Sequence, residues 1–158
     1  MIQMIRIEDL EIREMQSEDL DGVTDLEESC FSMPWKRADF EDILTRSDRI
    51  YLVAIYKGCL LGGCMMSDIV GEGDISNVAV YEQYRGQRIA DALLKAMFVL
   101  GMERGITDYT LEVRSQNQSA IKLYERNGFV TEGVRKNFYQ KPTDDAFIMW
   151  KRSKNSPN

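Results

Sequence analysis

The sequence predicts a mixed α/β fold in which helices cover both faces of one sheet. Three observations carry this prediction: apolar residues at helical spacing between Ile89 and Leu100, a turn at Lys57-Gly58 between two apolar runs, and a later β-rich run over Tyr109–Val113. In chain order the predicted elements are β-α-α-β-β-β-α-β-α-β-β. With 158 residues and a mass of 18.2 kDa, the chain has the size of one domain with one core.

The first elements are a strand and two helices. A strand is predicted over Glu11–Met15. Ser17 is the predicted N-cap of a helix that runs to about Cys30, because its hydroxyl can accept from the first-turn amides. Pro34 cannot continue that helix, and a second helix is predicted over Lys36–Thr45.

Three strands follow, predicted over Tyr51–Tyr56, Cys59–Ile69 and Asp74–Val80, of which the first two form a hairpin. The next helix is the most strongly marked, because its apolar residues recur at near 3.6-residue spacing. These residues are Ile89, Leu93, Ala96, Met97 and Leu100. Gly105 is its predicted C-terminal stop.

The last predicted elements are the strand Tyr109–Val113, a helix over Ser119–Asn127 closed by Gly128, and strands near Phe129–Phe138 and Ala146–Lys151. No linker or repeat divides the chain, so we expect a single domain over residues 1–150. Residues 151–158 are expected to form a polar C-terminal tail.

Composition bounds the class of protein. A hydrophobic fraction of 44% and a charged fraction of 29% are typical of a soluble globular domain. Apolar runs such as Tyr51–Tyr56 are too short to cross a bilayer, and no apolar signal-peptide core precedes the first strand. We therefore expect a cytoplasmic protein that is not bound to a membrane. We also expect a monomer.

The absence of histidine removes whole mechanisms. No Ser-His-Asp or Cys-His system can be assembled, so acid–base chemistry must come from carboxylate, tyrosine, cysteine or lysine. The three cysteines, Cys30, Cys59 and Cys64, are odd in number and irregularly spaced, which favours reduced core thiols over disulfides. No metal site is expected, since no C-x-x-C pair is present.

The net charge of −6 and a pI of about 4.8 argue against a nucleic-acid-binding protein, which would present a basic face. An acidic enzyme could attract a basic partner, although solubility alone also explains such a charge.

The first candidate motif is Val78–Val80 followed by Tyr84–Asp91, a strand that leads through a tight turn into the strongest helix. The free amides and the dipole of a helix N-terminus form an anion site suited to a diphosphate. Many such units bind nothing, so the motif alone leaves a purely structural role equally open. Both the P-loop and the dinucleotide fingerprint are absent.

The second motif joins Thr110–Arg114 to Asn117–Phe129. The alternation of a strand places Glu112 on one face with Thr110, opposite its two apolar neighbours. Tyr124 lies in the helix that follows. A solvated glutamate and a core tyrosine are the commoner explanations for such residues taken singly.

Together, the segments NVAV, YRGQRIADALL and LEVRSQNQSAIKLYERNGF resemble the GNAT superfamily of N-acetyltransferases in order and spacing. The flanking segments CFSMPW and RKNFYQKPTDDAFIM extend the resemblance toward its members that acetylate the N-terminal alanine of ribosomal proteins. The resemblance implies a mostly antiparallel central sheet of about seven strands flanked by about four helices, with acetyl-CoA as co-substrate.

The resemblance also implies roles for single residues. The backbone of Val78, Ala79 and Val80 would pair with the pantetheine arm of the cofactor. Seven amides would hold its diphosphate: those of Arg85, Gly86, Gln87, Arg88, Ile89, Ala90 and Asp91. Asn117 would contact the cofactor, Glu112 would be the catalytic base, and Tyr124 the general acid. The acceptor groove would be lined by Phe31, Pro34, Trp35, Arg135, Asn137 and Tyr139, although simple interhelical packing explains Phe31 and Trp35 better from the sequence alone.

Arg88 departs from the family pattern, which usually has glycine at this position. If the position needs a positive φ or close phosphate approach, arginine would be strained or would crowd the diphosphate. Alternatively, the guanidinium adds positive charge to the phosphate site, which we favour.

Several functions remain open. The leading hypothesis is acetylation of the N-terminal alanine of ribosomal protein number eighteen of the small subunit, a basic client. The alternatives are acetylation of a small amine such as a polyamine or an aminoglycoside, acetylation of protein lysine, and a non-catalytic CoA-binding module.

Overall fold

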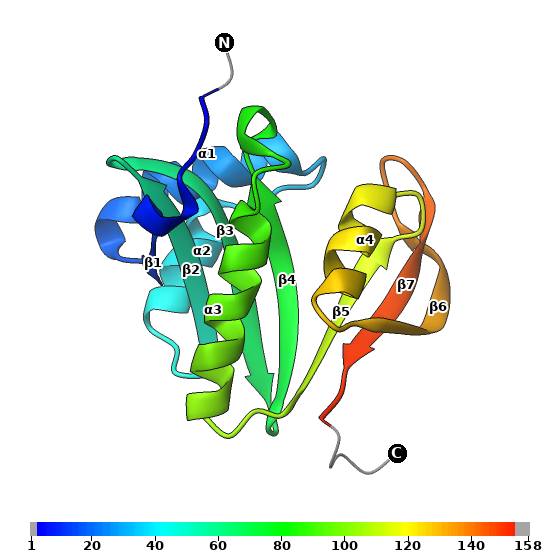
Figure 1. Ribbon diagram of the computed structural model, residues 1–158. Coiled ribbons are helices and arrows are strands. Elements are labelled where there is room, and N and C mark those ends of the chain that lie inside the picture. The colour runs from blue at the N-terminus through cyan, green and yellow to red at the C-terminus, as the bar shows by residue number, and fades with distance from the viewer. Residues whose placement is uncertain (1–2, 154–158) are drawn as a thin grey trace.

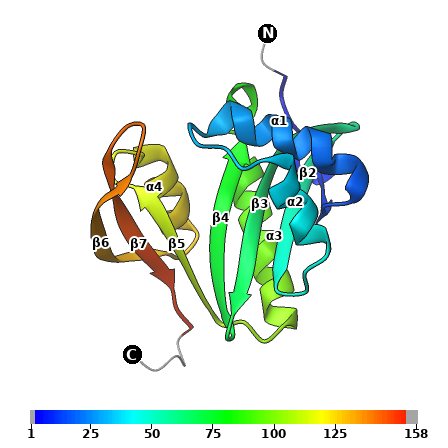
Figure 2. The same ribbon diagram turned by 180° about the vertical axis from the view of Figure 1, so that it is seen from behind.

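The structure is a computed structural model that describes residues 3–153. Its seven-stranded sheet has the order β1-β2-β3-β4-β5-β7-β6. Helices α1 and α2 cover one face of the sheet, and α3 and α4 lie on the other (Figures 1 and 2). The strands are β1 (Glu11–Glu14), β2 (Arg49–Tyr56), β3 (Cys59–Ile69), β4 (Glu72–Val80), β5 (Asp108–Arg114), β6 (Val130–Tyr139) and β7 (Asp144–Lys151). The α-helices are α1 (Leu20–Cys30), α2 (Arg37–Leu44), α3 (Ile89–Glu103) and α4 (Gln118–Arg126), and the short 3₁₀ helices are η1 (Ile7–Asp9), η2 (Ser17–Asp19) and η3 (Glu82–Tyr84).

Strands β4 and β5 form the single parallel pair of the described sheet. Their pairing starts at Glu72↔Asp108 and ends at Asp74↔Thr110. Beyond this point the two strands separate, and Figure 1 shows the β5-β7-β6 part of the sheet turned away from the β1–β4 part. The sheet is therefore open in its middle, between the C-terminal halves of β4 and β5.

Strand β4 also carries a β-bulge. The register with β3 shifts between Met65↔Ser76 and Gly63↔Ala79, which leaves one extra residue in β4. Asn77 occupies the bulge with a φ of 53°, in the left-handed region that asparagine tolerates better than most residues. The bulge changes the direction of β4 just before Val78–Val80.

Two apolar cores lie on the two faces of the sheet. Leu93 and Met97 of α3 belong to the larger core, and both are fully buried. On the other face, Phe40 of α2 packs edge-on against Tyr51 of β2, with ring centroids 5.4 Å apart. Full burial of a side chain such as Leu93 stabilises the fold by about 1.5–3 kcal/mol. These cores fix α3 and the α1–α2 pair relative to β4.

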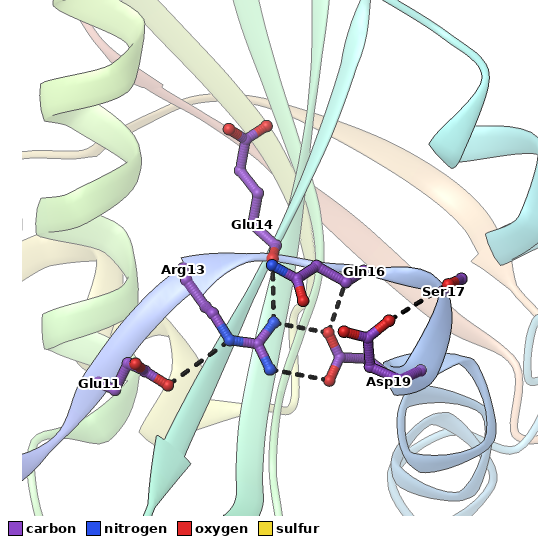
Figure 3. Close-up of polar contacts among 7 residues, drawn as sticks. Glu11, Arg13, Glu14, Gln16, Ser17 and Asp19 are labelled. Atoms are coloured by element: carbon purple, nitrogen blue, oxygen red, sulfur yellow. Dashed lines mark hydrogen bonds and ion pairs between the residues drawn. The ribbon is translucent and has the colours of Figure 1, made fainter.

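An ion pair with a buried carboxylate joins β1 to the start of α1 (Figure 3). Arg13 donates to both carboxylate oxygens of Asp19, at 2.7 and 3.0 Å, and the amide of Gln16 donates to the same carboxylate at 2.7 Å. The Arg13 hydrogen bonds hold the pKa of Asp19 below its usual range. The prediction that Ser17 is the helix N-cap is wrong: Gln16 and Asp19 form the capping box, and Ser17 donates to Glu18.

The predicted mixed fold with helices on both faces is confirmed, and so is the order of its strands and α-helices. The 3₁₀ helices were not predicted, and β2 begins two residues earlier than expected, at Arg49. Of the predicted tail, Lys151 ends β7, while residues 154–158 lie outside the described residues. Within residues 3–153, no helix combines the length and the apolar run needed to cross a membrane.

Candidate active site

A groove of about 580 Å³ runs beside the separated ends of β4 and β5. Strand β4, the turn before α3, and one side of α4 provide most of its lining. The lining residues are Cys30, Phe31, Val78, Ala79, Val80, Tyr84, Arg85, Gly86, Arg88, Ile89, Ala90, Asp91, Asn117, Ser119, Ala120, Lys122, Leu123, Tyr124 and Arg126. The groove thus brings together both motifs singled out in the sequence.

The turn before α3 presents free backbone donors. The first helical hydrogen bond runs from Ala92 N to Arg88 O at 3.0 Å, so the amides of Ile89, Ala90 and Asp91 have no acceptor within the helix. Gly86 and Arg88 both have positive φ, 79° and 69°. The turn therefore has the left-handed conformation at Arg88, where the family usually has glycine. This is the positive φ that the sequence analysis considered for this position. The Arg88 guanidinium is 66% exposed and lies 3.7 Å from Asp91.

Two residues of this turn use their side chains elsewhere. The carboxylate of Asp91 is buried and accepts from Arg126 at 2.8 and 2.9 Å and from Asn127 at 3.0 Å, which ties α3 to α4. These contacts hold the pKa of Asp91 below its usual range. Gln87 does not line the groove; its side chain accepts from the amide of Ile5 at 2.7 Å and donates to the carbonyl of Gln3 at 3.0 Å.

Strand residues Val78, Ala79 and Val80 line the groove at the side of β4 that faces away from β3. The carbonyl of Val80 accepts from Arg85 Nε at 2.9 Å and from Cys30 Sγ at 3.5 Å. Cys30 is therefore a groove residue that the sequence did not reveal.

The prediction of core thiols holds for Cys64 alone, because Cys30 lines the groove and Cys59 is exposed. Burial raises the pKa of the Cys64 thiol to about 12.

Helix α4 contributes a cap and a phenol. Asn117 caps the helix by accepting from the amide of Ala120 at 3.2 Å, so α4 starts one residue before the prediction. Tyr124 is buried, and its ring packs edge-on against Phe129 with centroids 5.9 Å apart. Burial raises the pKa of Tyr124 well above its usual range, with smaller contributions from Cys64 and Tyr139. The phenol therefore stays protonated at neutral pH.

The Glu112 side chain lies on the face of β5 opposite α3 and α4. Its neighbours Leu111 and Val113 are buried in the core beneath α3 and α4, whereas the Glu112 side chain is 32% exposed and does not line the groove. Arg135 lies 3.5 Å from its carboxylate. The base and acid implied by the resemblance thus extend from opposite faces of the opening between β4 and β5.

The negative charge of Glu112 contributes to the raised pKa of two neighbouring groups. Asp74 of β4 pairs with Thr110 of β5. Burial raises the pKa of Asp74, and the negative charge of Glu112 raises it further. The pKa of Tyr139 is raised to about 12, mainly by burial and then by Glu112. The guanidinium of Arg114 stacks on the Tyr139 ring, 4.5 Å from its centroid.

The residues expected to line the acceptor groove fall into separate groups. Phe31 lines the groove beside β4, and Pro34 is exposed. Trp35 packs against Phe40, with centroids 5.7 Å apart, which is the packing role that the sequence favoured. Asn137 has a φ of 52°, and its amide donates to Asp145 at 2.9 Å, where the register between β6 and β7 is irregular.

Sequence reasoning missed the basic side chains of α4 and one buried acid of α1. Lys122 and Arg126 stand four residues apart, a spacing that places them on one helix face, and both line the groove. Glu27 is 2% exposed. Glu27 stands four residues after Val23 and next to Leu26, which places it on the apolar side of α1. This spacing was the signal that could have revealed it.

No set of three or more histidine, cysteine or acidic residues is arranged to hold a metal ion in the part of the chain that the structure describes.

Comparison with known proteins identifies the family. Residues 20–129 match the Acetyltransferase (GNAT) family. The chain is 35% identical over 140 residues to the putative ribosomal protein bS18-alanine N-acetyltransferase of Bacillus subtilis (strain 168), a match that covers 88% of this chain and 93% of that protein. It is 29% identical over 143 residues to the ribosomal protein bS18-alanine N-acetyltransferase of Escherichia coli (strain K12), covering 87% of this chain and 94% of that one.

The crystal structure of the ribosomal-protein-S18-alanine N-acetyltransferase from Escherichia coli aligns with a TM-score of 0.83 at 25% identity, over 94% of this chain and 99% of that chain. The expected sheet and helices are those of this fold. Because the family match spans more than half of the chain and agrees with the fold, the protein belongs to the GNAT family and is an acetyl-CoA-dependent N-acetyltransferase.

Proposed function

We propose that the enzyme transfers the acetyl group of acetyl-CoA to the α-amino group of a protein N-terminus, and that its acceptor is the N-terminal alanine of ribosomal protein bS18, in the cytoplasm. The observation that carries this proposal is the 35% identity with a putative bS18-alanine acetyltransferase over 88% of the chain. The net charge of −6 agrees with a basic ribosomal client.

The groove suits the cofactor chemically. The free amides of Ile89, Ala90 and Asp91 stand at a helix N-terminus, where a diphosphate gains from both hydrogen bonds and the helix dipole. Four basic side chains of the lining add positive charge: Arg85, Arg88, Lys122 and Arg126. The pantetheine arm would extend along Val78–Val80, where β4 has no partner strand on the β5 side.

The reaction needs one base and one acid. In the proposed mechanism the acceptor amine attacks the thioester carbon, Glu112 takes the proton from the amine, and the bond from nitrogen to the acetyl carbon forms. When the intermediate collapses, the carbon–sulfur bond breaks and Tyr124 donates its proton to the leaving thiolate. Because burial raises the pKa of Tyr124, the phenol is still protonated when the thiolate leaves. No acyl-enzyme intermediate is required.

An α-amino group is the easier acceptor for a carboxylate base. With a pKa of about 7.7–8.0, roughly a tenth of it is neutral at pH 7, whereas a lysine side chain, at about 10.4, is neutral in roughly one molecule per few thousand. Removing a proton from lysine would ask more of Glu112.

Short peptides that differ only at their first residue test the acceptor. We expect acetylation of a peptide with the bS18 N-terminal sequence beginning with alanine, and fragmentation mass spectrometry should place the added acetyl group on the α-nitrogen. A matched peptide with a blocked N-terminus and a free lysine is the control. Acetylation of lysine alone, or turnover of polyamines and aminoglycosides without turnover of peptides, would replace this proposal by one of the alternatives.

Replacement of Arg88 by glycine separates charge from backbone strain. If the guanidinium supports the phosphates, Arg88→Gly should raise the KM for acetyl-CoA by about fivefold, as expected for one exposed ion pair of about 1 kcal/mol, and leave kcat unchanged. Glycine adopts the left-handed conformation freely, so relief of strain alone would lower the KM instead. Steady-state kinetics with acetyl-CoA as the varied substrate distinguishes the two results.

A further inference from the structure

A buried carboxylate on α1 connects two walls of the site. Glu27 is 2% exposed, and a single oxygen, Oε1, accepts two hydrogen bonds. One comes from Asn77 Nδ2 at 2.7 Å and the other from the backbone amide of Trp35 at 3.2 Å. These two donors lie far apart in the sequence, in the β4 bulge and in the segment between α1 and α2.

The bond to Asn77 acts on a strained part of the backbone. Asn77 holds a φ of 53° in the bulge, and a non-glycine residue in this region costs free energy unless its surroundings fix it. The next residues, Val78, Ala79 and Val80, line the groove. The conformation of Asn77 therefore decides where the β4 backbone directs its groups toward a bound cofactor.

The second bond acts on the segment that carries Phe31 and Trp35. Phe31 lines the groove directly, and Trp35 is anchored on Phe40. The amide of Trp35 has its acceptor on α1, so the same carboxylate that restrains the bulge also restrains this segment. One buried group thus sets the distance between the strand and the segment opposite it.

Burial of this acid has a cost. Desolvation raises the pKa of Glu27, outweighing the two hydrogen bonds, and its second oxygen, Oε2, has no hydrogen-bond partner among the described residues. A buried acid with one unpartnered oxygen is a poor stabiliser of a fold, because an apolar side chain would fill the same space without desolvation. A functional reason for its presence is therefore worth testing.

We propose that Glu27 is a positioning residue: it holds the Asn77 bulge of β4 and the Trp35 segment in the one arrangement that aligns the cofactor thioester with the acceptor amine. This inference rests on the proposed course of the cofactor along Val78–Val80. Glu27 itself exchanges no proton with the substrates.

Exchange of donor and acceptor tests the contact. Asn77→Asp keeps the tolerance for positive φ but sets a carboxylate against the carboxylate of Glu27. Glu27→Gln alone keeps an oxygen for both donors. In the double variant, the amide nitrogen of the introduced glutamine can donate to the introduced aspartate, so the hydrogen bond to the bulge is restored with its direction reversed, whereas the Trp35 amide loses the oxygen that it shared with Asn77. Each variant is compared with the unmodified enzyme, using whichever amine that enzyme acetylates.

We expect kcat to fall by about tenfold or more in Asn77→Asp and to stay within about threefold of the unmodified enzyme in Glu27→Gln. In the double variant kcat should recover in part, because the bond to the bulge is regained while the bond to the Trp35 amide is not. Inhibition by adenosine 3′,5′-bisphosphate, the nucleotide half of coenzyme A, should be unchanged throughout, because the turn before α3 is untouched. A general loss of folding would weaken that inhibition as well.

Three results would overturn the inference: full kcat in Asn77→Asp, no recovery in the double variant, or a loss in Glu27→Gln as large as in Asn77→Asp, which would mean that the carboxylate acts chemically. If Asn77→Asp does not fold, Asn77→Gly takes its place, since it keeps the bulge but lacks the amide; an unchanged kcat there contradicts the inference. Failure of the cofactor assignment would appear separately, as an unmodified enzyme that coenzyme A does not inhibit.

Discussion

Replacement of Glu112 by glutamine should lower kcat for peptide acetylation by about a hundredfold or more at pH 7, which is the usual loss when a general base is removed. The amide has nearly the same size, and the contact with Arg135 lies at the surface, so the fold should not change. In the variant, the amine must lose its proton to water. The rate should therefore rise with pH until the α-amino group itself titrates, at about 7.7–8.0.

The measurement is kcat/KM between about pH 6 and pH 9 for both enzymes, a range that brackets the α-amino pKa, with Glu132→Gln as the control. Glu132 is an exposed acid on β6 that pairs with Arg152 at 2.9 Å, away from the opening between β4 and β5. Its replacement should leave the profile unchanged. A Glu112→Gln variant with the rate and the profile of the unmodified enzyme would show that the base lies elsewhere.

Tyr124→Phe should lower kcat by about tenfold to a hundredfold and leave the KM for acetyl-CoA nearly unchanged. The loss is smaller than for the base, because a thiolate with a pKa of about 8.5 leaves without full protonation. The phenylalanine ring keeps the edge-on contact with Phe129, so the change removes a proton donor and little packing.

The raised pKa of Tyr124 adds a pH-dependent consequence. Its folded pKa lies above the ordinary value of 10.0, so its contribution to stability is complete below pH 10 and is lost as the pH rises beyond that value. Activity should consequently show no decline attributable to this phenol between about pH 7 and pH 10. Thermal unfolding above this range should be less pH-dependent in Tyr124→Phe.

Tyr109→Phe is the matched control. Tyr109 is buried and donates to the carbonyl of Phe98 at 3.3 Å, in the C-terminal half of α3, whereas the turn precedes the N-terminus of that helix. It should lose stability without losing kcat. The assignment of Tyr124 as the acid is untenable if both variants retain full kcat.

Periodicity was sufficient to predict most of the fold. Helix α3 was found because its apolar residues form one continuous buried face, and Gly105 ends it with a φ of 80° as predicted. The alternation around Glu112 correctly placed Leu111 and Val113 in the core. Local chemistry was less reliable where two residues compete for one role, as at the start of α1, where Asp19 rather than Ser17 accepts the amide hydrogen bond.

The contacts that shape the site depend on tertiary structure, and no local pattern predicts them. Gln87 belongs to the motif of the turn, yet its side chain faces the N-terminal segment, because Ile5 and Gln3 reach it from more than eighty residues away. The bulge at Asn77 and its acceptor Glu27 are likewise fifty residues apart. The resemblance to the family located the groove, and the roles of Glu112 and Tyr124 stay predictions.

The separation of β4 and β5 leaves two rows of backbone hydrogen-bonding groups without a partner strand in the centre of the sheet, where most sheets are continuous. Unpaired rows of this kind are where a foreign strand can add to a sheet, so we expect more self-association in the enzyme without its acetyl donor. A substrate whose amide-containing arm lies along one row would cover it and favour the native state by mass action. The acetyl donor would then stabilise the folded enzyme as well as supply the acetyl group.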